Sequence, residues 1–218
     1  MLIRKATSKE VKFACQRFHY AKKAHCGNYQ YSIFNDEREW CGVIIFADGA
    51  NLHYGDQFGL IQGELLELVR VALNGKQECT SQCVAAAMRQ LHKDAPRIKM
   101  LISYADTGQG HLGTIYQATN WFYLGVSKAT VPTWIIKGKS IHNRTKSRSY
   151  GSKTLEEIRE TIDPNASIIE GTDKHKYVYF YDKKLKKKFL HLAKPYPKRE
   201  TGSQNADTIK DGTSLQAG

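Results

Sequence analysis

Apolar and polar residues alternate along this chain with the periods of strands and helices. Apolar runs, alone or alternating with polar residues, predict strands at 29–34, 40–46, 64–73, 98–104, 123–125, 133–137 and 177–181. Apolar residues that recur every three to four positions predict helices at 8–18, from about 81 to 93, after Gly113, and at 155–162. After the first helix, the core order is therefore strand, strand, strand, helix, strand, helix, strand, strand.

One stretch of this pattern carries a candidate active site. The strand that ends at Tyr104 is followed by Asp106, a glycine-rich turn and a short helix that contains Tyr116. A carboxylate at the C-terminal end of a strand lies where α/β folds form their ligand crevices, although Asp106 could instead only cap the helix. The glycine spacing also matches a dinucleotide-binding loop. That interpretation is excluded because no acidic residue follows about 20 positions later.

Length and cysteine content bound the class of protein. The 218 residues, 41% of them hydrophobic, are enough for one domain with one core and a tail. No run of about 18 apolar residues is present, so we expect no membrane association. The five cysteines are an odd number without zinc-site spacing, which favours reduced thiols and a cytoplasmic location.

The net charge of +12 suggests a polyanionic partner. Basic residues dominate from Lys128 to Arg199, and aromatic residues are interleaved with them, as expected where phosphates are held and bases are stacked. A nucleic acid, such as double-stranded DNA, is therefore an expected partner, although any single lysine is more often part of a solvated face. The predicted DNA contacts are Lys137, Lys139, Arg144, Lys146, Arg148 and Tyr150.

The order of elements resembles the GNAT acyltransferase fold. This resemblance implies an α+β fold with a central mixed, mostly antiparallel sheet flanked by helices, in which one strand splays from its neighbour. It also implies acetyl-CoA or another acyl or aminoacyl donor, bound by a loop and helix start that correspond to Asn74, Ser81 and Gln82. Tyr116 would correspond to the tyrosine that protonates the departing thiolate. Alternatively, Tyr116 is a core aromatic residue and Ser81 only caps its helix.

A closer resemblance is carried by short motifs. They are His19-Tyr20, the segments 67–70 and 103–106, Ser81, the segment 110–120 and the segment 176–179. These motifs resemble the Mom family of phage DNA-modification proteins over about residues 15 to 198. The resemblance implies conversion of adenine in DNA to a methylcarbamoylated form on its exocyclic amine, which protects the DNA from restriction. By this resemblance the functional residues are His19, Tyr20, Arg70, Ser81, Asp106 and Tyr116, and iron could bind at His19 and Asp106.

Chemical roles follow from the residue types. The amine of adenine is a poor nucleophile, so a base must accept its proton, and Asp106 is favoured over His19 for this task. Arg70 could hold a phosphate or carboxylate, or pair with Glu64 or Glu67. We expect the target adenine to be flipped out of the duplex and stacked near His19 and Tyr20.

Three regions are predicted along the chain. Residues 1–140 form the GNAT-like catalytic core, 141–200 form a basic C-terminal extension for DNA contact, and 201–218 form a disordered tail. The chain could also pair with a second copy as a homodimer. Two other functions compete with DNA modification: an acyl-CoA-dependent N-acyltransferase that acts on a protein or small-molecule amine, and a non-catalytic DNA-binding protein.

Overall fold

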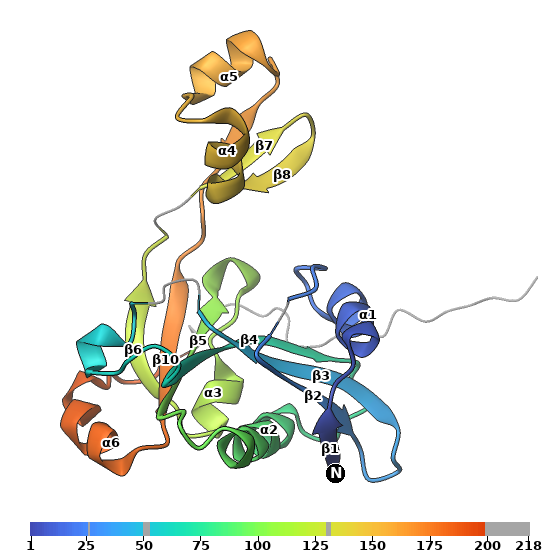
Figure 1. Cartoon of the computed structure of the whole chain (residues 1–218), viewed down its shortest axis with the longest axis vertical. Helices are drawn as coiled ribbons and strands as arrows, with labels where there is room; N and C mark the ends of the chain where they lie inside the picture. Colours follow the sequence, from blue (N-terminus) through green and yellow to red (C-terminus); the bar gives the residue numbers. More distant parts are fainter. Residues whose placement is uncertain (26, 50–52, 130–131, 199–218) are drawn as a thin grey trace, which may run out of the picture.

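A seven-stranded sheet in the order β1-β2-β3-β4-β5-β10-β6 forms the centre of the protein (Figure 1). The computed structural model describes residues 1–25, 27–49, 53–129 and 132–198. The strands are β1 (Leu2–Lys5), β2 (Tyr29–Phe34), β3 (Trp40–Ala47), β4 (Leu65–Leu73), β5 (Met100–Asp106), β6 (Phe122–Ser127) and β10 (Lys174–Phe180). Neighbouring strands of this sheet are antiparallel, except that β4 and β5 are parallel.

Helices cover both faces of this sheet. On one face, α2 (Thr80–Asp94) and α3 (Thr114–Ala118) enclose the largest apolar cluster, which includes Leu66, Leu68 and Leu101. On the opposite face, α1 (Ser8–Phe18) covers β3 and β4, while η1 (Asp56–Phe58) and α6 (Lys183–Phe189) cover β5 and β10. The α+β, GNAT-like fold class that the sequence predicts is confirmed.

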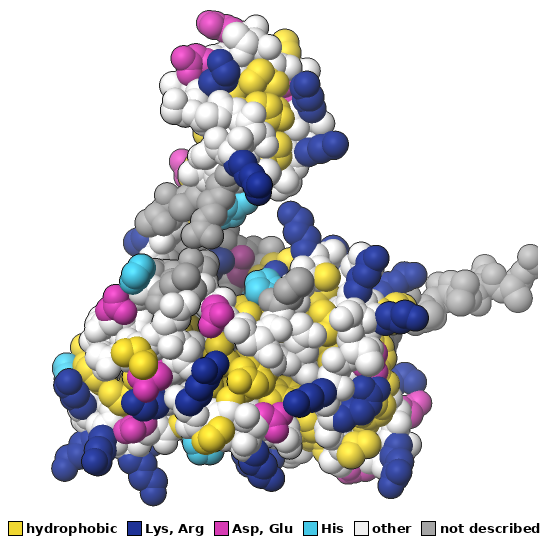
Figure 2. All heavy atoms as spheres, in the orientation of Figure 1, with side chains coloured by type: hydrophobic (Ala, Val, Ile, Leu, Met, Phe, Trp, Pro, Cys, Tyr) yellow, Lys and Arg dark blue, Asp and Glu magenta, His cyan; other side chains and the backbone are white. Residues whose placement is uncertain are grey.

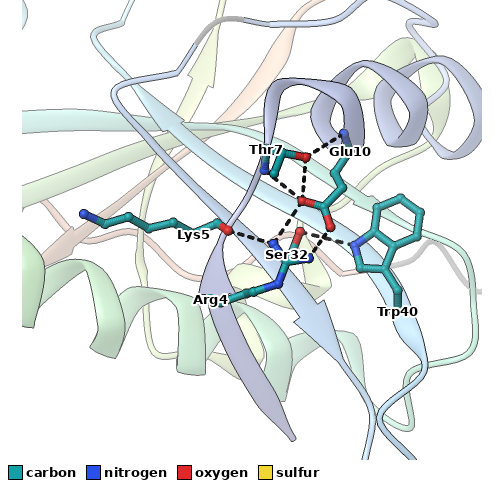
Figure 3. A network of polar contacts seen from close by, with 6 residues as sticks. All are labelled: Arg4, Lys5, Thr7, Glu10, Ser32 and Trp40. Atoms are coloured by element: carbon teal, nitrogen blue, oxygen red, sulfur yellow. Dashed lines mark hydrogen bonds and ion pairs between the residues drawn. The ribbon is translucent and has the colours of Figure 1, made fainter.

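A polar network fixes the start of α1 to the sheet (Figure 3). Thr7 and Glu10 form a capping box, in which the Thr7 hydroxyl accepts from the Glu10 N–H and the Glu10 carboxylate accepts from the Thr7 N–H. Both terminal nitrogens of Arg4, on β1, donate to the same carboxylate at 3.1 and 2.5 Å. Close by, the Trp40 indole N–H donates to Ser32. The orientation of α1 is therefore set before the helix reaches His19.

A separate lobe stands off the end of the sheet between β6 and β10 (Figure 1). It contains the strands β7 (Thr133–Ile136), β8 (Lys139–His142) and β9 (Ser167–Ile169) and the helices α4 (Asn143–Tyr150) and α5 (Leu155–Thr161). The strands form their own antiparallel sheet in the order β8-β7-β9, and Trp134, Ile136, Ile158 and Ala166 form its core. We call residues 132–170 the inserted lobe.

The predicted boundary at residue 140 does not match this arrangement. The inserted lobe begins before 140, and β10 returns from it to pair with both β5 and β6 inside the main sheet. Tyr177 and Val178 of β10 are fully buried, so this lysine-bearing segment is an interior strand of the core and not part of an extension. The predicted tail at 201–218 lies outside the described residues.

Two further findings concern the classes of protein considered above. Among the described residues, no helix is long and apolar enough to cross a membrane. Cys15, Cys41, Cys79 and Cys83 are free thiols, whereas Cys26 lies outside the described residues.

Candidate active site

The strands β4 and β5 pair over only three residues and then separate. The paired residues are Leu65–Glu67 of β4 and Met100–Ile102 of β5. At the next register position, the side chain of Ser103 takes the place of a main-chain hydrogen bond. Ser103 Oγ lies 2.8 Å from the carbonyl oxygen of Leu68 and 2.8 Å from Tyr116 Oη. A serine hydroxyl has one proton, so when Ser103 donates to Leu68 the Tyr116 phenol donates to Ser103. The predicted splay is present, and Tyr116 reaches it from α3.

Tyr116 is both a core residue and a candidate acid. Its side chain packs against Trp121 and Tyr177, and only 7% of the residue is exposed. Burial raises the pKa of Tyr116 to about 12, although the hydrogen bond with Ser103 opposes this shift. The phenol therefore keeps its proton at neutral pH, as a proton donor must.

A β-bulge in β4 directs Arg70. In the pairing with β3, Ile45 lies opposite Arg70 and Phe46 lies opposite Leu68, so Val69 is an extra residue in β4. The Arg70 guanidinium donates to the Val69 carbonyl at 2.6 Å, but among the described residues its buried Nε has no hydrogen-bond partner. A guanidinium that keeps unused donors can still bind a carboxylate or a phosphate.

The glutamates considered as partners of Arg70 can be partly assigned. Glu64 forms an ion pair with Lys99 at 2.5 Å, so the alternative pairing of Glu64 with Arg70 is not observed.

His19 follows the last residue of α1 and is buried. Its Nδ1 accepts a hydrogen bond from the Ala21 N–H at 3.1 Å, which leaves the ring proton on Nε2. Burial, and to a smaller extent the nearby charge of Arg70, lower the pKa of His19 to about 4. His19 is therefore a neutral imidazole at physiological pH.

Tyr20 connects the end of α1 with the loop after β5. Its ring stacks on His19 with centroids 4.4 Å apart and meets the edge of His111 at 5.8 Å. Partial burial raises the pKa of the Tyr20 phenol, and the negative charge of Asp106 adds to this effect. Since 52% of Tyr20 is exposed, its ring is available for stacking on an incoming aromatic group.

Asp106 ends β5, as the sequence predicts, and its carboxylate caps the short helix η2 (Thr107–Gln109). Its Oδ1 accepts from the Gly108 N–H at 2.9 Å and from the Thr172 hydroxyl at 2.5 Å. Among the described residues no hydrogen bond reaches Oδ2. Oδ1 therefore caps η2, as the alternative interpretation of Asp106 predicts, while the lone pairs of Oδ2 are left for a proton.

The predicted cofactor loop is only partly suited to its role. The Asn74 side chain is committed to its own turn, because it donates to the Trp40 carbonyl and accepts from the Lys76 N–H. This geometry gives Asn74 a structural role in the turn, while its assignment as a cofactor ligand stays a prediction. Ser81 is half-buried and Gln82 is exposed in the first turn of α2.

The first turn of α2 favours negative charge. The Ser81 hydroxyl and the backbone N–H groups of Gln82 and Ser81 lower the pKa of the Cys79 thiol. The same N–H and hydroxyl groups suit the phosphate of an acyl-CoA or a related molecule.

The predicted iron site is not supported. Within the described ranges, no group of three or more His, Cys, Asp or Glu side chains is arranged to hold a metal ion. His19 uses Nδ1 to accept a backbone hydrogen bond, and Asp106 uses Oδ1 to cap η2. The structure therefore does not support His19 and Asp106 as metal ligands.

The predicted DNA contacts all lie in the inserted lobe, but they are not equivalent. Lys137, Lys139 and Arg148 are exposed, and Tyr150 packs against the core of the lobe. Arg144 lies in α4, and its side chain is outside the described part of the structure.

Lys146 is a structural residue. Its ammonium group donates to the carbonyl oxygens of Gly151 and Lys153 and lies 4.6 Å from the centre of the Trp134 ring. Only 5% of Lys146 is exposed, so its assignment as a DNA contact is wrong. The sequence does not distinguish it from its exposed neighbours because the burial depends on a tryptophan twelve positions earlier.

Charge is segregated within the lobe. Figure 2 shows acidic side chains over α5 and basic side chains on the side of β8. The lysines of α6 lie at the other end of β10, about 20 Å from Asp106 for a strand of this length. The lysines of α6 are therefore distant from the lobe, whereas Lys174 lies at the end of β10 from which the lobe rises.

Two residues of the site were missed at the level of sequence. Ser103 lies in the motif 103–106, but the sequence predicts no role for it. Its position opposite Leu68 follows only from the pairing of β4 with β5. Thr172 lies 66 residues from Asp106 along the chain, and nothing in the sequence links the two.

Comparisons with known protein sequences identify a family for this chain. A family model described as the Mom protein family matches residues 1–198. The methylcarbamoylase Mom of Escherichia phage Mu is 22% identical over 191 residues, which cover 84% of this chain and 78% of that protein.

Solved structures with a similar arrangement include two acetyltransferases. One, from Bacillus subtilis in complex with CoA, has a TM-score of 0.45 and 12% identity and covers 83% of this chain and 97% of its own. The other, a GNAT family acetyltransferase from Elizabethkingia anophelis with acetyl-CoA bound, has a TM-score of 0.43 and 14% identity, with coverage of 82% and 97%.

Proposed function

The chain belongs to the Mom protein family, and we propose that it is a phage DNA-modification transferase that methylcarbamoylates adenine on its exocyclic amine. The relative from phage Mu is named as a methylcarbamoylase, which supports this reaction class. The modification would protect the DNA from restriction in the host cytoplasm. The observation that carries the proposal is the grouping of Asp106, Tyr20, His19 and Arg70 around the end of β5.

Asp106 is the proposed general base. The lone pair of the exocyclic amine is delocalised into the purine ring, so its proton must leave as the new bond forms. With Oδ1 held by two donors, Oδ2 accepts that proton. His19 is less suited to this role, because its Nδ1 already accepts from the Ala21 N–H and its other ring nitrogen carries the proton.

Tyr20 and His19 are the proposed binding surface for the base. An adenine inside a stacked duplex cannot present its amine to Asp106, so it must be flipped out. The exposed ring of Tyr20, stacked on neutral His19, offers an aromatic face next to the carboxylate. Arg70 has donors left for the phosphate or carboxylate of a reactant.

We place the donor of the transferred group on the other side of the splay. The first turn of α2, with Ser81 and Gln82, fits the phosphate of an acyl-CoA or a related activated donor, since it stabilises negative charge. When bound, the donor supplies the electrophilic carbon. Tyr116 holds a proton at the splay between this turn and Asp106.

The inserted lobe is the proposed DNA-contact unit. It rises from the same end of the sheet as Asp106, because Lys174 at the start of β10 pairs with Asp106. Lys139 and Arg148 are exposed on its basic side, where they can reach phosphates.

The test is to express the protein in bacteria, digest the DNA to nucleosides and measure deoxyadenosine by mass spectrometry. We expect a mass-shifted deoxyadenosine with the wild type and its loss, by about 10²-fold or more, with Asp106→Asn. Asp36→Asn, which changes an exposed carboxylate in the turn between β2 and β3, is the matched control and should behave as wild type.

Unmodified DNA from cells that contain folded wild-type protein would argue against the proposal. Acylation of a protein or a small amine by the same preparation would then favour the N-acyltransferase alternative.

A further inference from the structure

The segment that returns from the inserted lobe is hydrogen-bonded to the loop of the candidate base. The Thr172 hydroxyl donates to Asp106 Oδ1 at 2.5 Å. The next carbonyl, that of Asp173, accepts from both the N–H and the hydroxyl of Thr107, at 3.1 and 2.7 Å. Three hydrogen bonds therefore join this segment to Asp106, the last residue of β5, and to Thr107, which follows it.

The base of the lobe is itself tied together at this point. The Asp173 carboxylate accepts from the Ala129 N–H at 3.0 Å and from Lys128 Nζ at 2.7 Å, both on the outgoing segment. The entry and exit of the lobe are thus fixed to each other as well as to Thr107.

We propose that Thr172 is a positioning residue that holds the Asp106 carboxylate in the orientation needed to accept a proton. The inference rests on the proposed function, in which Asp106 is the general base. Thr172 touches neither DNA nor donor in this scheme and acts only through Asp106.

The contacts at the carboxylate explain why two donors are needed. The Gly108 N–H is a neighbour in the same turn and moves with Asp106, so alone it cannot fix the carboxylate relative to the rest of the site. Thr172 belongs to a different segment, so its hydrogen bond fixes the carboxylate relative to the rest of the site. With both donors on Oδ1, rotation of the carboxylate about its last bond is restricted and Oδ2 keeps one direction.

Packing around Thr172 restricts its own rotamer. A β-carbon added to Gly108 would lie 2.3 Å from Thr172 Cγ2, so the backbone and the methyl group are already in close contact. A β-branched side chain has few χ1 rotamers, and this contact selects among them. The hydroxyl is thereby directed at Asp106, which an unconstrained serine would reach less often.

The experiment compares Thr172→Val with Thr172→Ser. Valine keeps the branched shape and the contact with Gly108 but cannot donate, whereas serine keeps only the donor. For Thr172→Val we expect kcat for adenine modification to fall by about 10-fold or more, with the KM for DNA unchanged. Thr172→Ser should recover most of this loss. In an Asp106→Asn background, Thr172→Val should cause no further loss.

A second readout does not depend on activity. Hydrogen exchange of the Gly108 amide should become at least about 10-fold faster in Thr172→Val and return toward the wild-type rate in Thr172→Ser. Asp36→Asn, the exposed carboxylate variant that serves as the control above, should leave both readouts unchanged.

Unchanged kcat and unchanged exchange in Thr172→Val would overturn the proposal, as would equal losses of kcat in the valine and serine variants. If the wild type modifies no adenine, the proposed function fails, and the exchange rates alone decide whether Thr172 holds the carboxylate.

Discussion

Ser103 Oγ lies 2.8 Å from the carbonyl oxygen of Leu68, at the first register position where β4 and β5 no longer pair. A buried carbonyl without a partner costs stability, so the serine hydroxyl substitutes for the main-chain donor that the separation removes. The same hydroxyl contacts the Tyr116 phenol. The opening between the strands is therefore a satisfied polar junction inside an apolar core.

Replacing Ser103 tests this junction. Ser103→Ala should lower the free energy of unfolding by about 1–3 kcal/mol, because the Leu68 carbonyl and the Tyr116 phenol lose their shared partner. Urea unfolding of Ser103→Ala, Tyr116→Phe and the double variant measures the coupling of the two side chains. Additive losses would mean that the hydroxyl and the phenol do not interact.

Removing only the Tyr116 hydroxyl separates its two roles. Tyr116→Phe keeps the ring in the core, so we expect a small change in Tm and a fall in turnover of about 10²-fold or more if the phenol donates a proton. Tyr31→Phe is the matched control, since it removes a buried phenol that donates to Asp94, at the opposite end of α2 from Ser81. A stable Tyr116→Phe protein with wild-type turnover would show that the tyrosine only packs.

The ionisation of His19 can be followed by NMR. We expect its ring resonances to titrate with a midpoint near pH 4, because burial and Arg70 disfavour the imidazolium. The unfolded chain binds this proton near pH 6.5, so the contribution of His19 to stability is complete above pH 6.5 and is lost as the pH falls toward 4. Arg70→Gln should raise the midpoint without restoring 6.5. A wild-type midpoint near 6.5 would contradict the burial of the ring.

The Arg4–Glu10 pair makes stability depend on acid. Burial raises the pKa of Glu10, but hydrogen bonds from Arg4 and Thr7 outweigh it and lower the pKa to about 2. This contribution is complete above about pH 4.5 and is lost as the pH falls toward 2. Glu10→Gln should lower the free energy of unfolding by about 1–2 kcal/mol at neutral pH, with allowance for the partly exposed arginine.

Thermal unfolding of Glu10→Gln from pH 2 to pH 7 measures this effect. Glu39→Gln is the control, because Glu39 pairs with Lys76 at the surface, where such pairs contribute little. Equal behaviour of the two variants would show that the network at the start of α1 has no special weight.

If the basic side of the inserted lobe contacts DNA as proposed, we expect the DNA affinity to depend on salt. Lys139→Ala with Arg148→Ala should weaken binding to all sequences alike and reduce the slope of log affinity against log salt by about 2. Fluorescence anisotropy at several salt concentrations measures both. Lys146→Met should instead destabilise the lobe, by about 1–3 kcal/mol, because two carbonyl groups lose their donor. Wild-type affinity and slope in the double variant would move the DNA-contact surface elsewhere.

The sequence predicts strands correctly where buried strands consist of runs of apolar residues. The segments at β2, β3 and β4 match the structure within one residue, because their side chains meet apolar residues of α1 and α2. β1 was not predicted. It is a short edge strand with little buried surface, which leaves little periodic signal.

Charge misled the prediction where tertiary contacts neutralise it. The lysines of β10 suggested an extension, although the aromatic residues between them fill the core. Asp106 could be inferred from its place after a strand, and His19 and Tyr20 only from family resemblance. The bulge at Val69 and the contact between Thr172 and Asp106 depend on pairing between distant segments, which no local pattern encodes.

The inserted lobe lies between two strands that are neighbours in the main sheet, β6 and β10. Ser127 and Lys174 are paired across β6 and β10, so the lobe leaves and re-enters the sheet at neighbouring points that a short hairpin turn could also join. Its own apolar core makes it an independent module. A change in the length or sequence of this module can therefore leave the strand pairing of the main sheet intact.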